Sequence, residues 1–518
     1  MADITKGVRA FAVGTAISRV LGLARESVFA YLYGAGRSTD AFNAAFRIPN
    51  LLRDLFAETA LSAAFVPVLT ETKQKSKAEQ NLVASNVFNI LLITVAALVV
   101  LGIIFAPSIV HVIAFGFGKF PDKINLTATL TSVMFPFLLF IALAAWAMGY
   151  LNTEQEFFTP SLAPAFFNIL SIVTPLVLYA YLVKQGIDPI FGMAIGVLLG
   201  GLMQFLIQIP MLFRKGFHYK LYLNVADPNF RKIVLLFIPV AMGLAASRIN
   251  VAVDTFLISL LEERSMTWLN YAFRIMHLPL GLFGVAVGTV ALPTISKFVV
   301  EKKYDEVKAT LYDSLKLVFF LTVSTSIIIA FLSYPITRII YERGRFTTFD
   351  TYATTQALIL YIIGIPFAAA VRNVAAVYYA HKDAKIPMYA SFVAVGFNIV
   401  LNLILMRIIG YRAFPLSTTI SSLVNILLLF HFLTHKIGPF NIKPIAHYYM
   451  LLVIAACVGG FFGMLINQFL SSTLGVSFFY QIVTIIVSGF VSFIIFYVVC
   501  LVLGIHEVKS YVKRFIKR

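Results

Sequence analysis

Stretches of apolar residues long enough to cross a lipid bilayer recur along the whole chain. A helix needs about 20 such residues to span a hydrocarbon core of about 30 Å. Charged residues make up only 12% of the chain, whereas soluble domains carry about 25%. Long continuous apolar runs exclude a strand barrel, in which polarity alternates. The sequence therefore predicts an all-α polytopic membrane protein of about fourteen spans, near 8–33, 41–69, 82–107, 127–151, 160–183, 189–213, 232–260, 270–296, 311–333, 352–379, 386–408, 412–434, 447–470 and 478–504.

Short motifs repeat in the same order in the two halves of the chain. Ala16–Arg19 recurs as Ala245–Arg248, and Phe167–Ile169 recurs as Phe397–Ile399, at offsets of about 229 and 230 residues. Six spans separate the copies, which predicts a parallel duplication of two pseudo-symmetric six-helix lobes with the binding site at their interface. We expect an N-terminal lobe over 1–225 (spans 1–6), a C-terminal lobe over 226–440 (spans 7–12), and two extra helices with a basic tail over 441–518.

Basic residues concentrate in the loops that follow even-numbered spans, although Arg338, Arg343 and Arg345 are an exception. This pattern and the even span number predict that both termini are cytoplasmic. It also explains the net charge of +18 without nucleic acid binding. The start of the chain lacks a cleavable signal pattern, so we expect a retained first span. Cys457 and Cys500 offer no metal-ligand spacing.

Four arginines, Arg19, Arg25, Arg53 and Arg274, fall inside segments that otherwise read as spans. An arginine at the bilayer centre costs about 2.5–3.5 kcal/mol on insertion scales. Such charges persist where they face protein or water, and cationic groups in a wet cavity suggest an anionic cargo. We found no nucleotide-binding loop and no nucleophile elbow, so we expect a transporter that hydrolyses no ATP and is not an enzyme.

The charges of the first two spans lie on defined helix faces. Ser18, Arg19, Gly22, Arg25 and Glu26 fall within an arc of about 120°. This face either lines a solvated cavity or holds helices together through an ion pair with Glu26. In the second span, Pro49 should bend the helix, and Arg53 lies deeper than Arg47. The residues sharing one arc of that span are Arg47, Asn50, Asp54 and Glu58.

Oxygen-bearing side chains gather in spans seven, eleven and twelve. Asp254 shares a helix face with Asn250, while Asn398 and Asn402 are four residues apart and Thr418 follows in the next span. A carboxylate with amide and hydroxyl oxygens suits Na⁺ or a proton-linked site. Hydrogen bonding between helices explains the same spacing equally well.

The N-terminal motifs carry a resemblance to a known family. They are Ser18–Glu26, Gly34–Gly36, Thr39–Phe42, Ile48–Arg53, Phe56–Glu58 and Ala64–Pro67. Together with the stretch from Arg274 to Pro293, they resemble the MurJ (MviN) lipid II flippase family within the multidrug/oligosaccharidyl-lipid/polysaccharide exporter superfamily. The resemblance covers nearly the whole chain.

The resemblance implies a flippase that moves undecaprenyl-diphosphate-linked peptidoglycan precursor (lipid II) from the inner to the outer leaflet of the bacterial cytoplasmic membrane by alternating access. It implies a substrate site made of Arg19, Arg25, Asp40, Arg53 and Arg274, with Ser18 and Glu58 in support. The ion site of some members maps to Asp254, Asn398, Asn402 and Thr418, but Asn402 stands where such members have Asp, which removes a charge.

The expected energy source is Na⁺ or proton coupling or the membrane potential, with no other cofactor and no nucleotide. The expected partners are lipid II and the bilayer. Nothing in the sequence requires an oligomer, so we expect a monomer, and association with the cell-wall synthesis machinery stays open. Three alternatives share parts of the pattern: a flippase for another lipid-linked oligosaccharide, a cation-coupled multidrug exporter, and a membrane scaffold that transports nothing.

Overall fold

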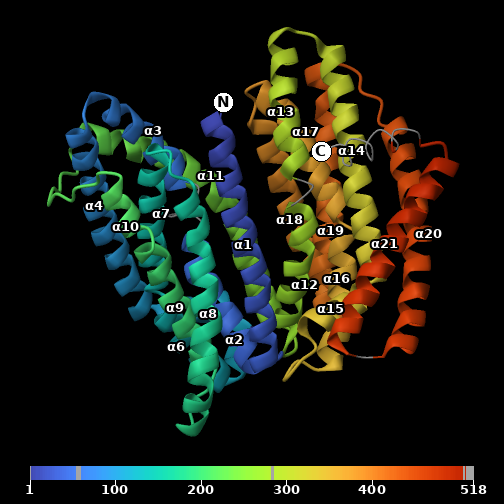
Figure 1. Ribbon diagram of the computed structural model, residues 1–518, viewed down its shortest axis with the longest axis horizontal. Helices are drawn as coiled ribbons and strands as arrows, with labels where there is room; N and C mark the ends of the chain where they lie inside the picture. Colours follow the sequence, from blue (N-terminus) through green and yellow to red (C-terminus); the bar gives the residue numbers. More distant parts are fainter. Residues whose placement is uncertain (1, 54–59, 282–284, 476, 506–507, 509–518) are drawn as a thin grey trace. The chain divides into compact units, whose positions relative to one another are not determined.

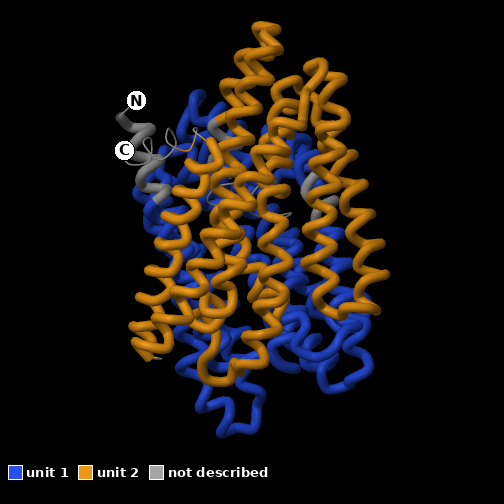
Figure 2. Tube along the Cα trace, turned by 90° about the vertical axis from the view of Figure 1, so that its right-hand side faces the viewer, with its two compact units in different colours: residues 1–267 blue, residues 268–518 orange. Residues whose placement is uncertain are grey.

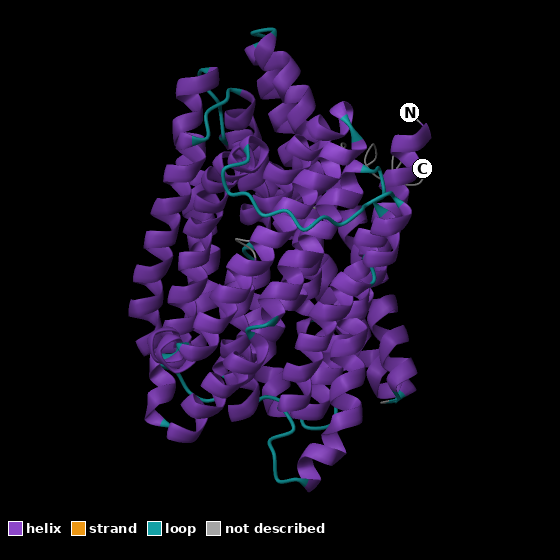
Figure 3. Ribbon diagram, turned by 90° about the vertical axis from the view of Figure 1, so that its left-hand side faces the viewer, coloured by secondary structure: helices purple, strands orange, loops and turns teal. Residues whose placement is uncertain are grey.

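The computed structural model describes residues 2–53, 60–281, 285–475, 477–505 and 508, and these residues form helices and loops without a strand (Figures 1 and 3). The first part of the chain forms α1 (Ala2–Tyr33), α2 (Arg37–Arg53), α3 (Ala60–Lys75), α4 (Lys77–Ile104), α5 (Ala106–Ile113), η2 (Phe115–Lys119), α6 (Pro121–Met134), α7 (Phe137–Thr153), α8 (Phe158–Lys184), α9 (Phe191–Leu206), α10 (Ile209–Arg214), α11 (Pro228–Ser259) and α12 (Ser265–Pro279). The second part forms α13 (Val285–Val300), α14 (Tyr304–Phe331), α15 (Ser333–Tyr341), α16 (Thr348–Ile362), α17 (Ile365–Ala380), α18 (Lys385–Ile409), η4 (Gly410–Arg412), α19 (Ala413–Ile437), α20 (Lys443–Leu474) and α21 (Phe478–Val502).

Within the described residues, nine helical segments are long and apolar enough to cross a membrane, and one of them, Lys385–Ile437, covers two predicted spans. This confirms an all-helical multi-pass protein, while the count of fourteen stays a prediction. The predicted spans outside the nine segments are the first, second, seventh and eighth. These four spans contain the predicted intramembrane charges. Two of them, the second and the eighth, are also interrupted by the undescribed residues 54–59 and 282–284.

Prolines divide two of the predicted spans into two helices each. Pro136 lies between α6 and α7, and Pro366 lies in the first turn of α17, which begins shortly after α16 ends at Ile362. Proline has no N–H to donate and is tolerated only in the first helical turn without loss of a hydrogen bond. The two prolines are 230 residues apart, so they belong to the repeat, although we did not predict these breaks. Pro49, by contrast, lies inside α2, which continues to Arg53.

The same helix packing occurs twice in the chain. In the first half, α3 packs on α4 and α7, α7 packs on α4 and α9, and α9 packs on α6 and α8. In the second half, α13 packs on α14 and α17, α17 packs on α14 and α19, and α19 packs on α16 and α18. Each helix of the first set thus has a counterpart ten labels later with the same neighbours, which supports the predicted duplication. The remaining hairpin of α20 and α21 packs on α14 and has no counterpart in the first half.

The chain divides into two compact units, Met1–Thr267 and Trp268–Arg518 (Figure 2). Helix α11 packs on α3, α4, α5 and η2 of the first unit, and the division falls inside α12. The predicted lobe boundaries at 225/226 and 440/441 follow the sequence repeat rather than compactness, and they stay predictions.

A cluster of charges around Glu154 ties together the ends of α3, α4 and α7. The Glu154 carboxylate accepts hydrogen bonds from Lys77 Nζ at 2.7 Å, Gln80 Nε2 at 2.9 Å and Lys73 Nζ at 3.0 Å. Burial alone raises the pKa of this carboxyl, but these donors hold the pKa below its usual range. Because the pKa of Glu154 is lower in the folded state than in the unfolded state, Glu154 stabilises the fold at pH values above the unfolded-state pKa. This contribution is lost as the pH falls through the folded-state pKa.

We therefore expect Glu154→Gln to lower the free energy of unfolding at neutral pH by about 1–2 kcal/mol, the net worth of hydrogen bonds to a charged group. The difference between variant and wild type should shrink as the pH falls through the acidic range. Thermal unfolding of the purified protein in detergent at several pH values measures it. Glu79→Gln is the control, since Glu79 pairs only with Lys75 on the surface of one chain segment and should change stability by less than about 1 kcal/mol.

Candidate functional site

Helix α1 carries its predicted polar face in two distinct environments. Arg25 is 8% exposed, pairs with Glu26 at 2.6 Å, and lies over the Phe167 ring with its guanidinium carbon 5.2 Å from the ring centroid. Arg19 is exposed, and Ser18 is partly exposed. The Asn168 amide on α8 donates to the Ser18 carbonyl at 2.9 Å and to its hydroxyl at 3.4 Å. The predicted pair with Glu26 thus exists at Arg25, while Arg19 has an exposed side chain.

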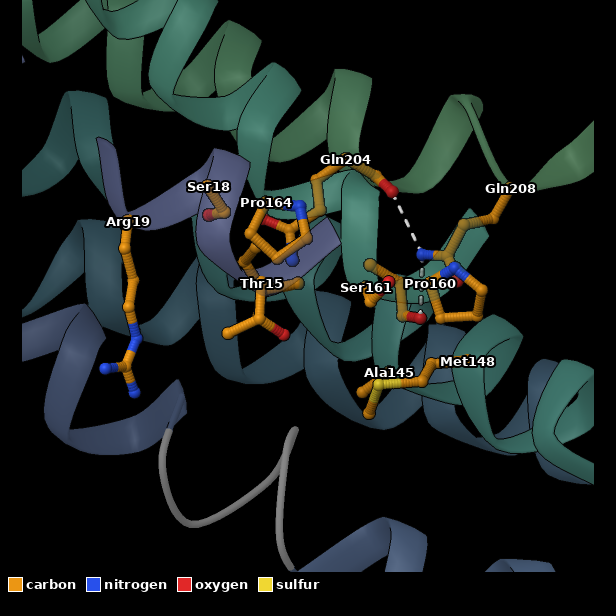
Figure 4. A pocket seen from close by; sticks show the side chains of 12 residues that line it. Thr15, Ser18, Arg19, Ala145, Met148, Pro160, Ser161, Pro164, Gln204 and Gln208 are labelled. Atoms are coloured by element: carbon orange, nitrogen blue, oxygen red, sulfur yellow. Dashed lines mark hydrogen bonds between the residues drawn. The ribbon is translucent and has the colours of Figure 1, made fainter. Parts of the chain in front are cut away.

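A pocket of about 260 Å³ opens beside Ser18 and Arg19, inside the first unit (Figure 4). Helix α7 forms an apolar wall and α8 contributes two prolines. The far end carries the amides of two glutamines. The lining residues are Thr15, Ser18, Arg19, Ile141, Ala144, Ala145, Met148, Pro160, Ser161, Pro164, Gln204 and Gln208.

Asp40, in the first turn of α2, is 1% exposed and fully engaged. Its carboxylate pairs with the buried Lys123 Nζ of α6 at 3.0 Å. It also accepts hydrogen bonds from the backbone N–H groups of Arg264 at 2.7 Å and Thr267 at 3.1 Å, and from the Thr267 hydroxyl at 2.7 Å. Those N–H groups belong to the start of α12, so Asp40 caps that helix and its charge complements the helix dipole.

This makes Asp40 a positioning residue for the first turn of α12, whose residues up to Thr267 belong to the first unit. The adjacent Trp268 belongs to the second unit, where its indole N–H donates to Asp350 at 3.0 Å. No local pattern in the sequence pairs Asp40 with Lys123, because the two residues lie 83 positions apart in the chain. Thr267 was missed for the same reason.

The remaining predicted ligands lie in both units. Arg53 ends α2 and is half-buried, and Glu58 lies outside the described residues. In the second unit, Arg274 and His277 are exposed on α12, and the charges of Arg274 and of Arg372 on α17 both act on His277. We had not singled out Arg372, although it lies within the predicted tenth span.

The predicted ion ligands are similarly divided. Asn398 and Asn402 are buried on α18, and the Asn402 amide donates to Asn398 Oδ1 at 3.2 Å. The Thr418 hydroxyl on α19 donates to the Phe414 carbonyl at 2.8 Å. Asp254 lies on α11 in the first unit. Within the described part of the chain, no group of three or more His, Cys, Asp or Glu side chains could hold a metal ion.

Substitution of the Asp40–Lys123 pair tests whether these contacts stabilise the fold around the start of α12. We expect Asp40→Asn to lower the free energy of unfolding by about 3–5 kcal/mol, because it leaves the Lys123 charge buried without its partner. The double variant Asp40→Asn/Lys123→Met should recover part of that loss, since both charges are then removed. Thermal unfolding in detergent measures both.

Asp122→Asn is the matched control, because Asp122 is exposed and lies 3.9 Å from Arg37. It should leave the melting temperature nearly unchanged. Equal effects of the Asp40 and Asp122 substitutions would contradict the capping role.

Comparison with known proteins gives a consistent picture. A family model described as "Lipid II flippase MurJ" matches residues 29–485. The chain is 36% identical over 430 residues to a "Probable lipid II flippase MurJ" of Vibrio cholerae, covering 80% of each chain. It is 33% identical over 424 residues to the "Lipid II flippase MurJ" of Burkholderia cenocepacia, covering 80% of this chain and 81% of the other.

Solved structures agree. One described as "Lipid II flippase MurJ, inward closed conformation" matches with a TM-score of 0.76 and 30% identity, over 95% of this chain and 99% of that chain. An inward-facing multidrug resistance transporter of the MATE family matches with a TM-score of 0.64 and 14% identity, over 83% of this chain and 98% of that one. The second likeness concerns the fold alone.

Proposed function

Because the chain belongs to the lipid II flippase MurJ family, we propose that it moves lipid II from the inner to the outer leaflet of the bacterial cytoplasmic membrane by alternating access. The observation that carries the proposal is the family match over most of the chain, combined with arginines on helices that pack among apolar spans. Both termini face the cytoplasm in this proposal, and the chain works as a monomer.

The arginines supply the chemistry that a diphosphate needs. A guanidinium keeps its charge in apolar surroundings and offers parallel N–H donors that match phosphate oxygens in pairs. Arg19 and Arg274 are exposed, so they contact the diphosphate directly, together with Arg53. Arg25 is held against Glu26 and Phe167, so in this conformation it contributes charge rather than a direct contact. Arg372 adds a further positive charge near His277, on which the charge of Arg274 also acts.

We expect Arg274→Ala to abolish flipping while leaving membrane insertion intact. The loss of one bidentate contact to a charged group costs about 1.5–3 kcal/mol, or roughly 10- to 150-fold in affinity. The measurement is made in a bacterium depleted of its own flippase and expressing this chain, by labelling lipid II that has reached the outer leaflet. Arg19→Ala should reduce labelling in the same way.

Arg407→Ala provides the control, because Arg407 is an exposed arginine in the last turn of α18. It should support normal labelling at equal membrane abundance. If Arg274→Ala and Arg407→Ala both sustain labelling at the wild-type level, the cationic site is not used for lipid II.

We further propose that the membrane potential, rather than Na⁺, drives the cycle. The Asn398–Asn402 pair is neutral, and the oxygen of Asn398 already accepts from Asn402. The pair itself supplies no carboxylate that would offset the desolvation of a cation. A net positive empty site responds to the potential, which contributes about 2.3 kcal/mol per charge per 100 mV.

Flipping should therefore be insensitive to replacing Na⁺ with K⁺ and should fall when an ionophore collapses the potential. Asn402→Asp should introduce Na⁺ dependence, since it restores a charge beside Asn398. The same labelling assay in Na⁺ and K⁺ buffers measures both effects, with Asn425→Asp on the neighbouring helix α19 as the control for an added charge. A wild-type requirement for Na⁺ would refute the potential-driven cycle.

A further inference from the structure

The residues that line the pocket beside Ser18 and Arg19 include a buried glutamine with an acceptor oxygen that the fold does not use. Gln208 is 1% exposed. Its Nε2 donates to the Ala144 carbonyl at 3.1 Å and to the Gln204 carbonyl at 3.0 Å. Among the described residues, its Oε1 has no hydrogen-bond partner. A flipped amide would place Oε1 against two carbonyl oxygens, so the hydrogen-bond network fixes this orientation.

Leaving a buried acceptor unsatisfied costs about 1–3 kcal/mol. A second acceptor lies in the same lining, because Pro164 has no N–H to donate to the carbonyl of Pro160, four residues earlier in α8. The Ser161 hydroxyl is not free to satisfy either acceptor, since it donates to the Phe158 carbonyl at 2.8 Å. The pocket therefore calls for a ligand that donates a hydrogen bond.

The other residues that line the pocket indicate which further chemical groups the ligand carries. The Ser18 hydroxyl accepts from Asn168, which leaves its proton available for a ligand carbonyl. Helix α7 offers an apolar wall through Ala145 and Met148. Among the described residues, no acidic side chain lines the pocket. In Figure 4, Arg19 lies at one end of the lining and Gln208 at the other, with Ser18 between them.

An N–H donor, a carbonyl acceptor and a methyl group together make an acetamido group. We infer that this pocket binds the acetamido group of an N-acetylated sugar that is joined to the cargo's diphosphate. The inference rests on the proposed function, because Arg19 at the pocket's edge is one of the proposed diphosphate contacts. The volume of about 260 Å³, against roughly 30 Å³ for one water molecule, accommodates an acetamido group with part of its ring.

The test compares two short-chain polyprenyl diphosphates that differ only at the sugar's second carbon: one carries N-acetylglucosamine and the other glucose. Their affinities for the purified full-length protein in nanodiscs are measured by native mass spectrometry. We expect the N-acetylated lipid to bind about tenfold more tightly, as one directed hydrogen bond and a buried methyl group allow. In Gln208→Met this ratio should fall toward one, with the glucose lipid bound as before.

Gln80→Met is the matched control. Gln80 is also a fully buried glutamine whose amide donates two hydrogen bonds, to Thr153 and Glu154, and whose Oε1 lacks a partner among the described residues, but it lies outside the pocket. It should keep the wild-type ratio. Ala145→Leu is a second test that narrows the pocket without touching the bonds of Gln208, and it should also remove the preference.

The outcomes separate the inference from the function on which it rests. Equal binding of the two lipids by the wild-type protein, or an equal loss for both lipids in Gln208→Met, overturns the acetamido assignment while the diphosphate site stands. No binding of either lipid, or binding that is unchanged in Arg274→Ala, contradicts the proposed function. A preference that arises only when the lipid also carries a peptide would assign the pocket to a peptide amide and overturn the sugar assignment.

Discussion

The cost of holding a charge in apolar surroundings is the constraint on which this structure depends. Asp40 meets that cost with four donors, one of them the buried ammonium of Lys123. Arg25 meets it with a carboxylate and an aromatic face. Removing the partner of such a buried charge costs several kcal/mol of folding free energy. These charges therefore hold the helices that supply their partners in place. Exposed arginines such as Arg19 and Arg274 keep their charge at a surface instead, where an anionic head group can meet them.

This constraint also bears on which helices carry the charges and which carry the repeated packing. Helices α3 to α9 and α13 to α19 repeat one packing pattern, down to the breaks at Pro136 and Pro366. The charged side chains of the predicted spans lie on α1, α2, α11 and α12, which are not among these helices. Apolar faces pack against one another without choosing a particular partner, whereas a buried charge must find its counter-charge or cap. The repeated helices therefore form the scaffold, and most of the intramembrane charges lie on helices outside it.

Sequence reasoning found what depends on local pattern. Apolar length predicted the helical membrane fold, helical spacing predicted the face shared by Ser18, Arg19 and Arg25, and the repeat predicted the recurrence of packing. It missed what depends on contacts between distant segments. Asp40 was assigned to the cargo site from resemblance, and only the fold brings it to Lys123 and Thr267. Gln208 shows no signal at all in the sequence, because a lone glutamine near a span end is recognisable as a ligand only once its amide bonds are known.

A cationic site alone attracts any lipid-linked diphosphate, since guanidinium groups recognise the phosphate oxygens and not the sugar beyond them. Discrimination between saccharides requires a polar group that the wrong cargo leaves unsatisfied, and such groups separate related ligands far better than apolar contacts do. The oxygen of Gln208 is a group of this kind, because its bonds to Ala144 and Gln204 hold it in place before any ligand arrives. Arg19 and Gln208 line the same pocket. A single pocket can therefore attract the charged diphosphate and also select a neutral group on the sugar.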